Sequence, residues 1–132
     1  MIQTRTKVKI IDNTGAKIGR CIKVYNKHKG IGKIGDIIMV SVIETDKDAQ
    51  KRGTSIKIKR GDIHKGVIVR TKKKSVVGTI QRSFDDNSII LIQRDTKTIA
   101  PIGNRVIEPI SGELVDNKQR YEKILAIAPR II

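Results

Sequence analysis

The 132-residue sequence has few cysteine, histidine and aromatic residues, and it has no tryptophan. Its single cysteine, Cys21, cannot form an internal disulfide or supply a thiolate metal cluster, and two histidines leave zinc with few ligands. Its three aromatic residues, Tyr25, Phe84 and Tyr121, are too few for the stacking platforms of OB-type or RRM-type single-strand binders. We therefore expect no metal site and no cofactor.

Long hydrophobic runs are also lacking. The longest apolar stretch, residues 37–43, is interrupted by Ser41 and is far shorter than the roughly 20 residues of a membrane-spanning helix. Residues 3–9 are charged and alternating, so we expect no signal or transit peptide. The length predicts a single soluble domain over 1–132, with a β-barrel core and basic loops over 1–94 and an extended and helical part over 95–132.

Acidic residues are scarce and unevenly distributed. Lys and Arg number 28 against 13 Asp and Glu, which gives a formal net charge of +15. Residues 1–74 contain 20 basic and 6 acidic side chains, whereas residues 75–132 contain 8 and 7. This excess predicts a polyanionic partner for the first part of the chain. The nearly neutral second part is expected to contact protein.

The residues between the basic side chains indicate which type of polyanion is bound. A membrane-surface binder would carry an amphipathic helix with Trp or Phe on its apolar face, but the basic part alternates like strands. Folded RNA, held through its phosphates by Lys and Arg, is the better interpretation. The candidate contact residues are Arg5, Lys7, Lys9, Lys17, Arg20, Lys23, Lys27, His28, Lys29, Lys33, Lys51, Arg52, Lys57, Lys59, Arg60, Lys65, Arg70, Lys72, Lys73, Lys74, Arg82 and Arg105.

Short β-branched segments separated by Gly and Asn turns predict a mainly β fold. Isoleucine accounts for 26 residues and favours strands. The spacing of the segments indicates a small, closed or nearly closed barrel. We expect strands over residues 2–11, 19–25, 36–44, 56–59, 66–71, 76–80 and 88–93, with short helices over 111–115 and 118–128 ending at Pro129.

Several motifs resemble catalytic sites but favour turns. Residues 30–35 match G-x-G-x-x-G, but a β-branched run follows where a dinucleotide site needs a helix. Asp85 and Asp86 are adjacent, so an extended backbone would point them apart, and a turn is the better interpretation. His28 lies between two lysines with no carboxylate to orient it. We therefore predict that the protein is not an enzyme.

Segments over nearly the whole chain, in order, resemble the universal large-subunit ribosomal protein L14 family. The resemblance lies in residues 1–4 (Met-Ile-Gln-Thr), 12–16 (Asp-Asn-Thr-Gly-Ala), 21–24, 34–38, 59–62 (Lys-Arg-Gly-Asp), 67–73, 84–87 (Phe-Asp-Asp-Asn), 101–106 (Pro-Ile-Gly-Asn-Arg-Val), 112–114 and 123–129. It implies a five-stranded β-barrel with a protruding β-ribbon and a short C-terminal helical region.

The resemblance also implies partners. It indicates binding to large-subunit rRNA, packing beside large-subunit proteins three and nineteen, and contacts with small-subunit rRNA at inter-subunit bridges. A ribosome-silencing factor would dock near the C-terminal part. The alternative from another class is a free-standing β-barrel RNA-binding factor, which a high-salt wash would strip from large subunits.

The sequence departs from the family pattern in four places. The segment 45–55 is longer and more acidic, 74–82 lacks an Asp-Gly hairpin turn, 95–99 looks inserted, and 115–118 replaces a basic helix. The abundance of Ile and Lys, which have A/T-rich codons, fits an organelle genome. We expect a ribosome in the mitochondrial matrix, with the bacterial cytoplasm and the plastid as alternatives.

Overall fold

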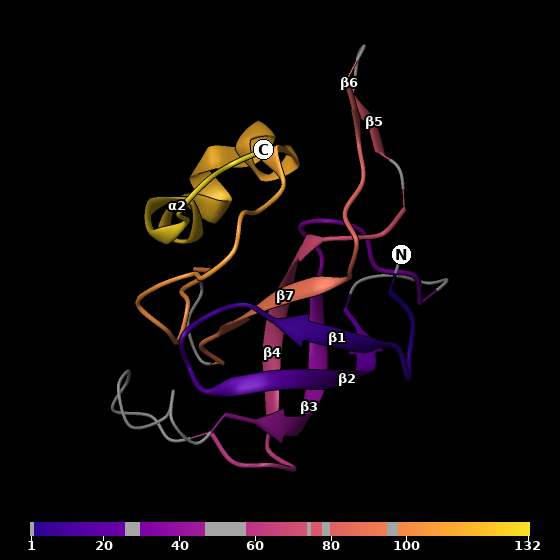
Figure 1. The fold of residues 1–132 in the computed structure, drawn as a ribbon, viewed down its shortest axis with the longest axis vertical. Helices are drawn as coiled ribbons and strands as arrows, with labels where there is room; N and C mark the ends of the chain where they lie inside the picture. The colour runs from indigo at the N-terminus through magenta and orange to yellow at the C-terminus, as the bar shows by residue number, and fades with distance from the viewer. Residues whose placement is uncertain (1, 26–29, 47–57, 74, 78–79, 95–97) are drawn as a thin grey trace.

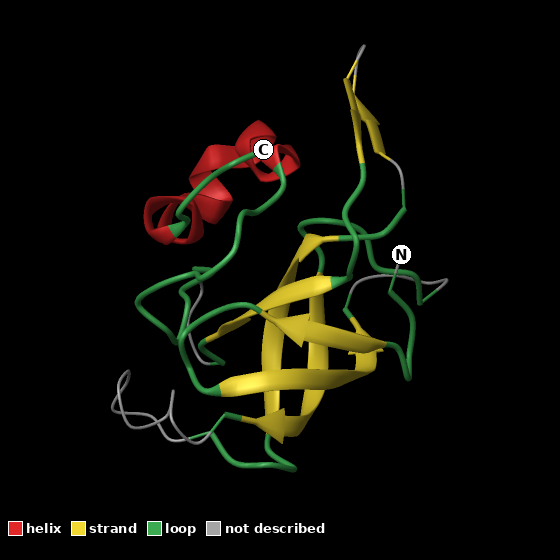
Figure 2. Ribbon diagram, in the orientation of Figure 1, coloured by secondary structure: helices red, strands yellow, loops and turns green. Residues whose placement is uncertain are grey.

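Five strands form a closed barrel in the computed structural model, which describes all residues except 1, 26–29, 47–57, 74, 78–79 and 95–97 (Figures 1 and 2). Antiparallel pairs run through the order β1-β2-β3-β4-β7, and a parallel pair between β1 and β7 closes the barrel. The strands are β1 (Lys7–Ile10), β2 (Ala16–Val24), β3 (Ile37–Thr45), β4 (Ile63–Arg70) and β7 (Ser88–Ile92). The predicted mainly β, five-stranded barrel is confirmed.

A two-stranded ribbon projects from the barrel between β4 and β7 (Figure 1). It pairs β5 (Ser75–Val77) with β6 (Ile80–Arg82) in antiparallel register. The ribbon confirms the protrusion that the resemblance implied. The single strand predicted over 76–80 is wrong, because Val77 and Ile80 belong to two different strands and are direct antiparallel partners.

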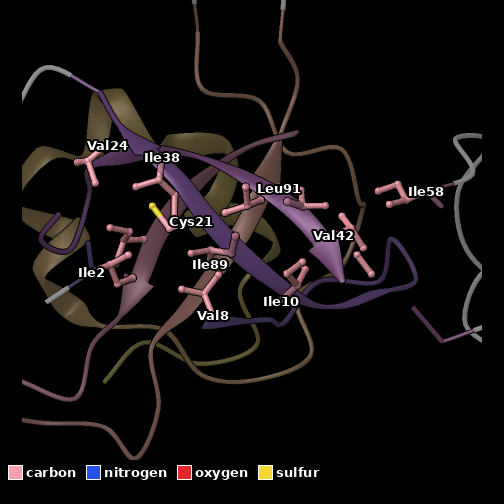
Figure 3. Packing of buried hydrophobic residues seen from close by; sticks show 13 residues of the cluster. Ile2, Val8, Ile10, Cys21, Val24, Ile38, Val42, Ile58, Ile89 and Leu91 are labelled. Carbon is pink, nitrogen blue, oxygen red and sulfur yellow. The ribbon is translucent and has the colours of Figure 1, made fainter. Parts of the chain in front are cut away.

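The barrel interior is aliphatic. Alternate residues of each strand point inward, as Val8 and Ile10 of β1 and Ile38, Val40 and Val42 of β3 do. Cys21 packs among them as a small buried hydrophobe (Figure 3). Burial raises the pKa of its thiol.

A second apolar cluster covers the outside of β4 and β7. The outward residues Val67 and Val69 of β4 and Ile90 of β7 pack against Leu114 and Ile124 from the C-terminal part. Both faces of β7 and of the second half of β4 are therefore buried, which explains why residues 67–69 and 89–92 are continuously apolar rather than alternating. On the other strands, the described side chains of Lys7, Lys9, Lys17 and Arg20 are exposed.

The C-terminal helices begin at a serine cap. The side chain of Ser111 accepts a hydrogen bond from the Glu113 amide, and a 3-10 helix, η1 (Gly112–Asn117), leads directly into α2 (Lys118–Ile127). Tyr121 and Ile124 are buried, so α2 packs this side against the barrel. Within the described residues, no helix is long and apolar enough to cross a membrane.

Two predicted strands are shorter or absent. The strand expected over 2–11 covers only Lys7–Ile10, because a turn at residues 3–6 holds Arg5 at a φ of 76° and bonds the Thr6 amide to the Gln3 carbonyl at 3.1 Å. In the segment 56–59, Ile56 and Lys57 lie outside the described residues. Ile58 is fully buried in the interior cluster and is not in a strand.

The glycine-rich segment before β3 is an ordered turn, not a dinucleotide loop. The Lys33 amide donates to the Asp36 carboxylate at 2.7 Å, and β3 follows immediately. Gly35 has a φ of +92°, and a Cβ at this position would lie 2.7 Å from the Tyr121 hydroxyl oxygen. That hydroxyl donates a hydrogen bond to the Gly35 carbonyl at 2.6 Å. Glycine at this position therefore lets α2 pack against the barrel.

Candidate nucleic-acid interface

Cationic side chains lie next to one another on the outer face of β1 and β2. Because Val8 and Ile10 point inward, Lys7 and Lys9 point outward and are exposed. Lys7 is the direct cross-strand partner of Arg20. Directly opposed residues are the closest side-chain neighbours in a sheet, so two like charges with no intervening acid face outward here.

A shallow hollow of about 310 Å³ lies at one end of this face. Lys7, Lys9, Lys17 and Lys72 line it, together with Asp86 and Asn87. The amide of Lys72 is fixed by the Asn87 side chain at 3.0 Å, which leaves its exposed ammonium group available. We define Lys7, Lys17, Arg20 and Lys72 as the cationic face.

Arg70 does not belong to this face. Its side chain is only 10% exposed, and its guanidinium donates to Asp86 and to the Pro109 carbonyl. Burial raises the pKa of Asp86, but hydrogen bonds from Arg70 and Ser88 and the charges of Arg70 and Lys9 outweigh it and leave the pKa below its ordinary value. Arg70 is therefore an internal ion-pair partner.

Lys9 is partly exposed, like the residues of the cationic face, but it is also paired with acids, like Arg70. Its ammonium lies 2.5 Å from a Glu108 carboxylate oxygen and 3.9 Å from an oxygen of Asp86, while 45% of its side chain is exposed. Its charge is thus partly neutralised within the chain, and we leave it outside the cationic face.

A second group of cations surrounds Tyr25 on the outer faces of β2, β3 and β4. The ammonium groups of Lys23 and Lys65 lie 5.4 and 5.2 Å from the centre of its ring. Both lysines are direct partners of Met39, which places them on either side of β3. Cation–π attraction favours both ammonium groups near this ring.

The remaining candidates are dispersed. Six lie elsewhere on the surface, none of them buried: Arg5, Lys33, Lys59, Arg60, Lys73 and Arg105. Lys27, His28, Lys29, Lys51, Arg52, Lys57 and Lys74 lie outside the described residues, and Arg82 is on β6, where only the backbone is described.

Sequence reasoning missed Arg94 and Arg120. Both line a hollow of about 270 Å³ next to Lys65, between the end of β7 and the start of α2. No local pattern marks them, because they come from the nearly neutral part of the chain and meet only through the fold. Burial and the charge of Arg94 lower the pKa of nearby His64, with Asp62 acting in the opposite direction.

Two of the described acidic residues, Asp12 and Asp86, make hydrogen bonds within the fold. Asp85 is exposed, whereas Asp86 binds Arg70 and accepts a hydrogen bond from the Ser88 hydroxyl at 2.8 Å. Asp12 is buried, which raises its pKa, and it accepts hydrogen bonds from Thr14 and the Leu91 amide. These carboxylates therefore join segments of the fold.

A small barrel with a lysine- and arginine-lined outer face is typical of proteins that bind phosphate-rich partners. The family model of ribosomal protein L14p/L23e matches residues 1–132, so the chain belongs to this family. It is accordingly a structural protein of the large ribosomal subunit that acts in translation, and the family is not one of enzymes. This membership favours a ribosomal constituent over a free-standing RNA-binding factor.

Proposed function

We propose that the protein binds folded large-subunit rRNA through the cationic face. The observation that carries the proposal is the direct pairing of Lys7 with Arg20 beside a hollow that Lys17 and Lys72 also line. Four cations grouped on two adjacent strands and a neighbouring turn can neutralise phosphates of a compact RNA.

The chemistry is electrostatic and independent of base identity. Arg20 can direct two N–H donors at one phosphate, whereas Lys7 and Lys17 act as point charges. The closed barrel fixes the backbone positions of β1 and β2, so the cations are arranged before RNA binds and little conformational entropy is lost.

The other candidates extend this interface as proposals. Exposed cations on turns, such as Arg5, Lys33, Lys59 and Arg60, would reach neighbouring phosphates, and so would the candidates outside the described residues. Arg70 is left out of the proposed contact set because its guanidinium is bound to Asp86 and Glu108.

The C-terminal part is proposed to meet protein. Its nearly neutral charge and the exposure of Ile107, at 62%, support contacts of lower polarity than those of the cationic face. We propose large-subunit proteins three and nineteen as neighbours, small-subunit rRNA at bridges, and a ribosome-silencing factor near this part. The Ile- and Lys-rich composition supports a mitochondrial ribosome ahead of a bacterial or plastid one.

The salt dependence of rRNA binding tests the proposal. We would measure affinity for deproteinised large-subunit rRNA by filter binding from 50 to 300 mM KCl. The variant Lys7→Gln/Lys17→Gln/Arg20→Gln should weaken binding and make the log–log salt slope shallower by about 2 to 3, because each lost phosphate contact removes about 0.7 to 0.9.

The matched control removes the same charge elsewhere. Lys118→Gln/Lys123→Gln/Arg130→Gln changes three exposed cations of the C-terminal part. The proposal expects a much smaller change in slope for this control. Equal changes for the two triple variants would show that only net charge matters and would overturn the cationic face as the interface.

A further inference from the structure

Three cations from distant parts of the sequence meet at the hollow between β7 and α2. Lys65 lies on β4, Arg94 follows the end of β7, and Arg120 is in the first turn of α2. Gln93 and Gln119 add amide groups to the same lining. Lysine, arginine and glutamine all supply N–H donors, so the polar part of this site is suited to an acceptor-rich ligand.

The charges at this site have no acidic partner among the residues that the structure describes. Among the described residues that line the hollow there is no carboxylate, and within the described part of the chain none of the three cations has an ion-pair partner. Three cations around one hollow repel each other, which raises the free energy of the empty site and is relieved by an anion.

Two of the three cationic side chains contact aromatic rings of the fold. The ring of Tyr25 lies 5.2 Å from the Lys65 ammonium, and the Tyr121 ring lies 5.6 Å from the Arg120 guanidinium. The hydroxyl of Tyr121 is in turn bonded to the Gly35 carbonyl, which fixes the start of α2 against the barrel. Pre-positioned donors lose less entropy on binding.

The size and the lining of the hollow restrict the ligand. Its 270 Å³ is slightly below the roughly 300 Å³ at which pockets for drug-sized molecules begin, so a small group fits better than a large metabolite. Ile92 and Ile99, both buried, add apolar surface to the lining. A tetrahedral oxyanion with an attached sugar or base matches this combination.

We propose that Lys65, Arg94 and Arg120 form a second phosphate-binding site, separate from the cationic face. The ligand is a phosphate group, presented either by an RNA strand or by a free nucleotide. Arg94 and Arg120 each direct a guanidinium at the oxyanion, and Lys65 supplies a point charge from the barrel wall. The nearly neutral part of the chain thus contributes to anion binding through its fold and not through its net charge.

The test uses the full chain labelled with ¹⁵N and inorganic pyrophosphate as the probe. The side-chain Nε–Hε signals of Arg94 and Arg120 should shift in a saturable manner, and Arg94→Gln/Arg120→Gln should lower the affinity at least about tenfold, as expected for loss of charged hydrogen bonds. The control Lys123→Gln/Arg130→Gln removes two other exposed charges and should leave the affinity unchanged within about twofold.

A second titration, with a short single-stranded oligoribonucleotide, distinguishes the two sources of phosphate. If the oligoribonucleotide shifts the same arginine signals and added pyrophosphate reverses these shifts, the phosphate comes from RNA. If pyrophosphate shifts the signals and the oligoribonucleotide does not, the phosphate comes from a free nucleotide. Non-saturating shifts spread over all arginines, or equal losses of affinity in the two double variants, would overturn the site. Because Lys7, Lys17 and Arg20 are intact in every variant, failure here leaves the proposed rRNA interface standing.

Discussion

Arg70 and Glu108 join the barrel to the C-terminal part, with 3.1 Å between the Nη1 atom and a carboxylate oxygen. Arg70 lies at the end of β4, and Glu108 lies in the segment that precedes η1. The same guanidinium binds Asp86, which lies just before β7. One buried cation therefore connects three segments of the fold.

Removing this cation should destabilise the protein. We expect Arg70→Gln to lower the free energy of unfolding by about 2 kcal/mol, between the values typical of exposed and buried ion pairs, because Asp86 and Glu108 are themselves partly exposed. Urea unfolding would measure the change. Lys123→Gln, on the exposed side of α2, should change stability by less than about 0.5 kcal/mol, and similar losses for both variants would contradict the assigned role.

Asp86 should make stability depend on acid pH. Its pKa is lower in the folded protein than in the unfolded chain, so it contributes stability above its unfolded pKa of about 3.9, and that stability is lost as the pH falls through the folded pKa. Urea midpoints measured from pH 7 down to pH 2 should therefore converge for wild type and Asp86→Asn. A constant difference across this range would contradict the ion pair with Arg70, and Asp116→Asn, at an exposed position, is the control.

Gly35 and Gly30 provide a matched test of how α2 packs. Both have positive φ, but a Cβ at Gly30 would meet nothing within 4 Å, whereas one at Gly35 would lie 2.7 Å from the Tyr121 hydroxyl. Gly30→Ala should lose about 1 kcal/mol through backbone strain alone, and Gly35→Ala clearly more. Hydrogen exchange should show α2 amides losing protection only in Gly35→Ala, and equal effects would argue against this contact.

Much of the fold is predictable because short apolar segments and turn residues report local structure directly. The barrel strands and α2 follow from β-branched runs and from the spacing of Tyr121, Ile124 and Leu125. The first strand was predicted too long because alternation alone cannot reveal that Arg5 has a positive φ. The division at residue 94 stays a prediction.

The site was less predictable than the fold. Charge density indicated β1 and β2 correctly as basic, but it could not separate Lys7, which is exposed, from Arg70, which is bound to Asp86 and Glu108. Nor could it find Arg94 and Arg120, which lie 26 positions apart and meet only once α2 packs on the barrel. Which cations form ion pairs, and which distant cations meet at one hollow, depend on the tertiary structure and cannot be deduced from composition.

Determining the structure of the assembled large subunit that contains this chain would test the central claim most directly. The account predicts rRNA phosphate oxygens within hydrogen-bonding distance of Lys7, Lys17 and Arg20 on the outer face of β1 and β2. Finding these three side chains in solvent, with rRNA instead against Lys118 and Lys123 of α2, would contradict it.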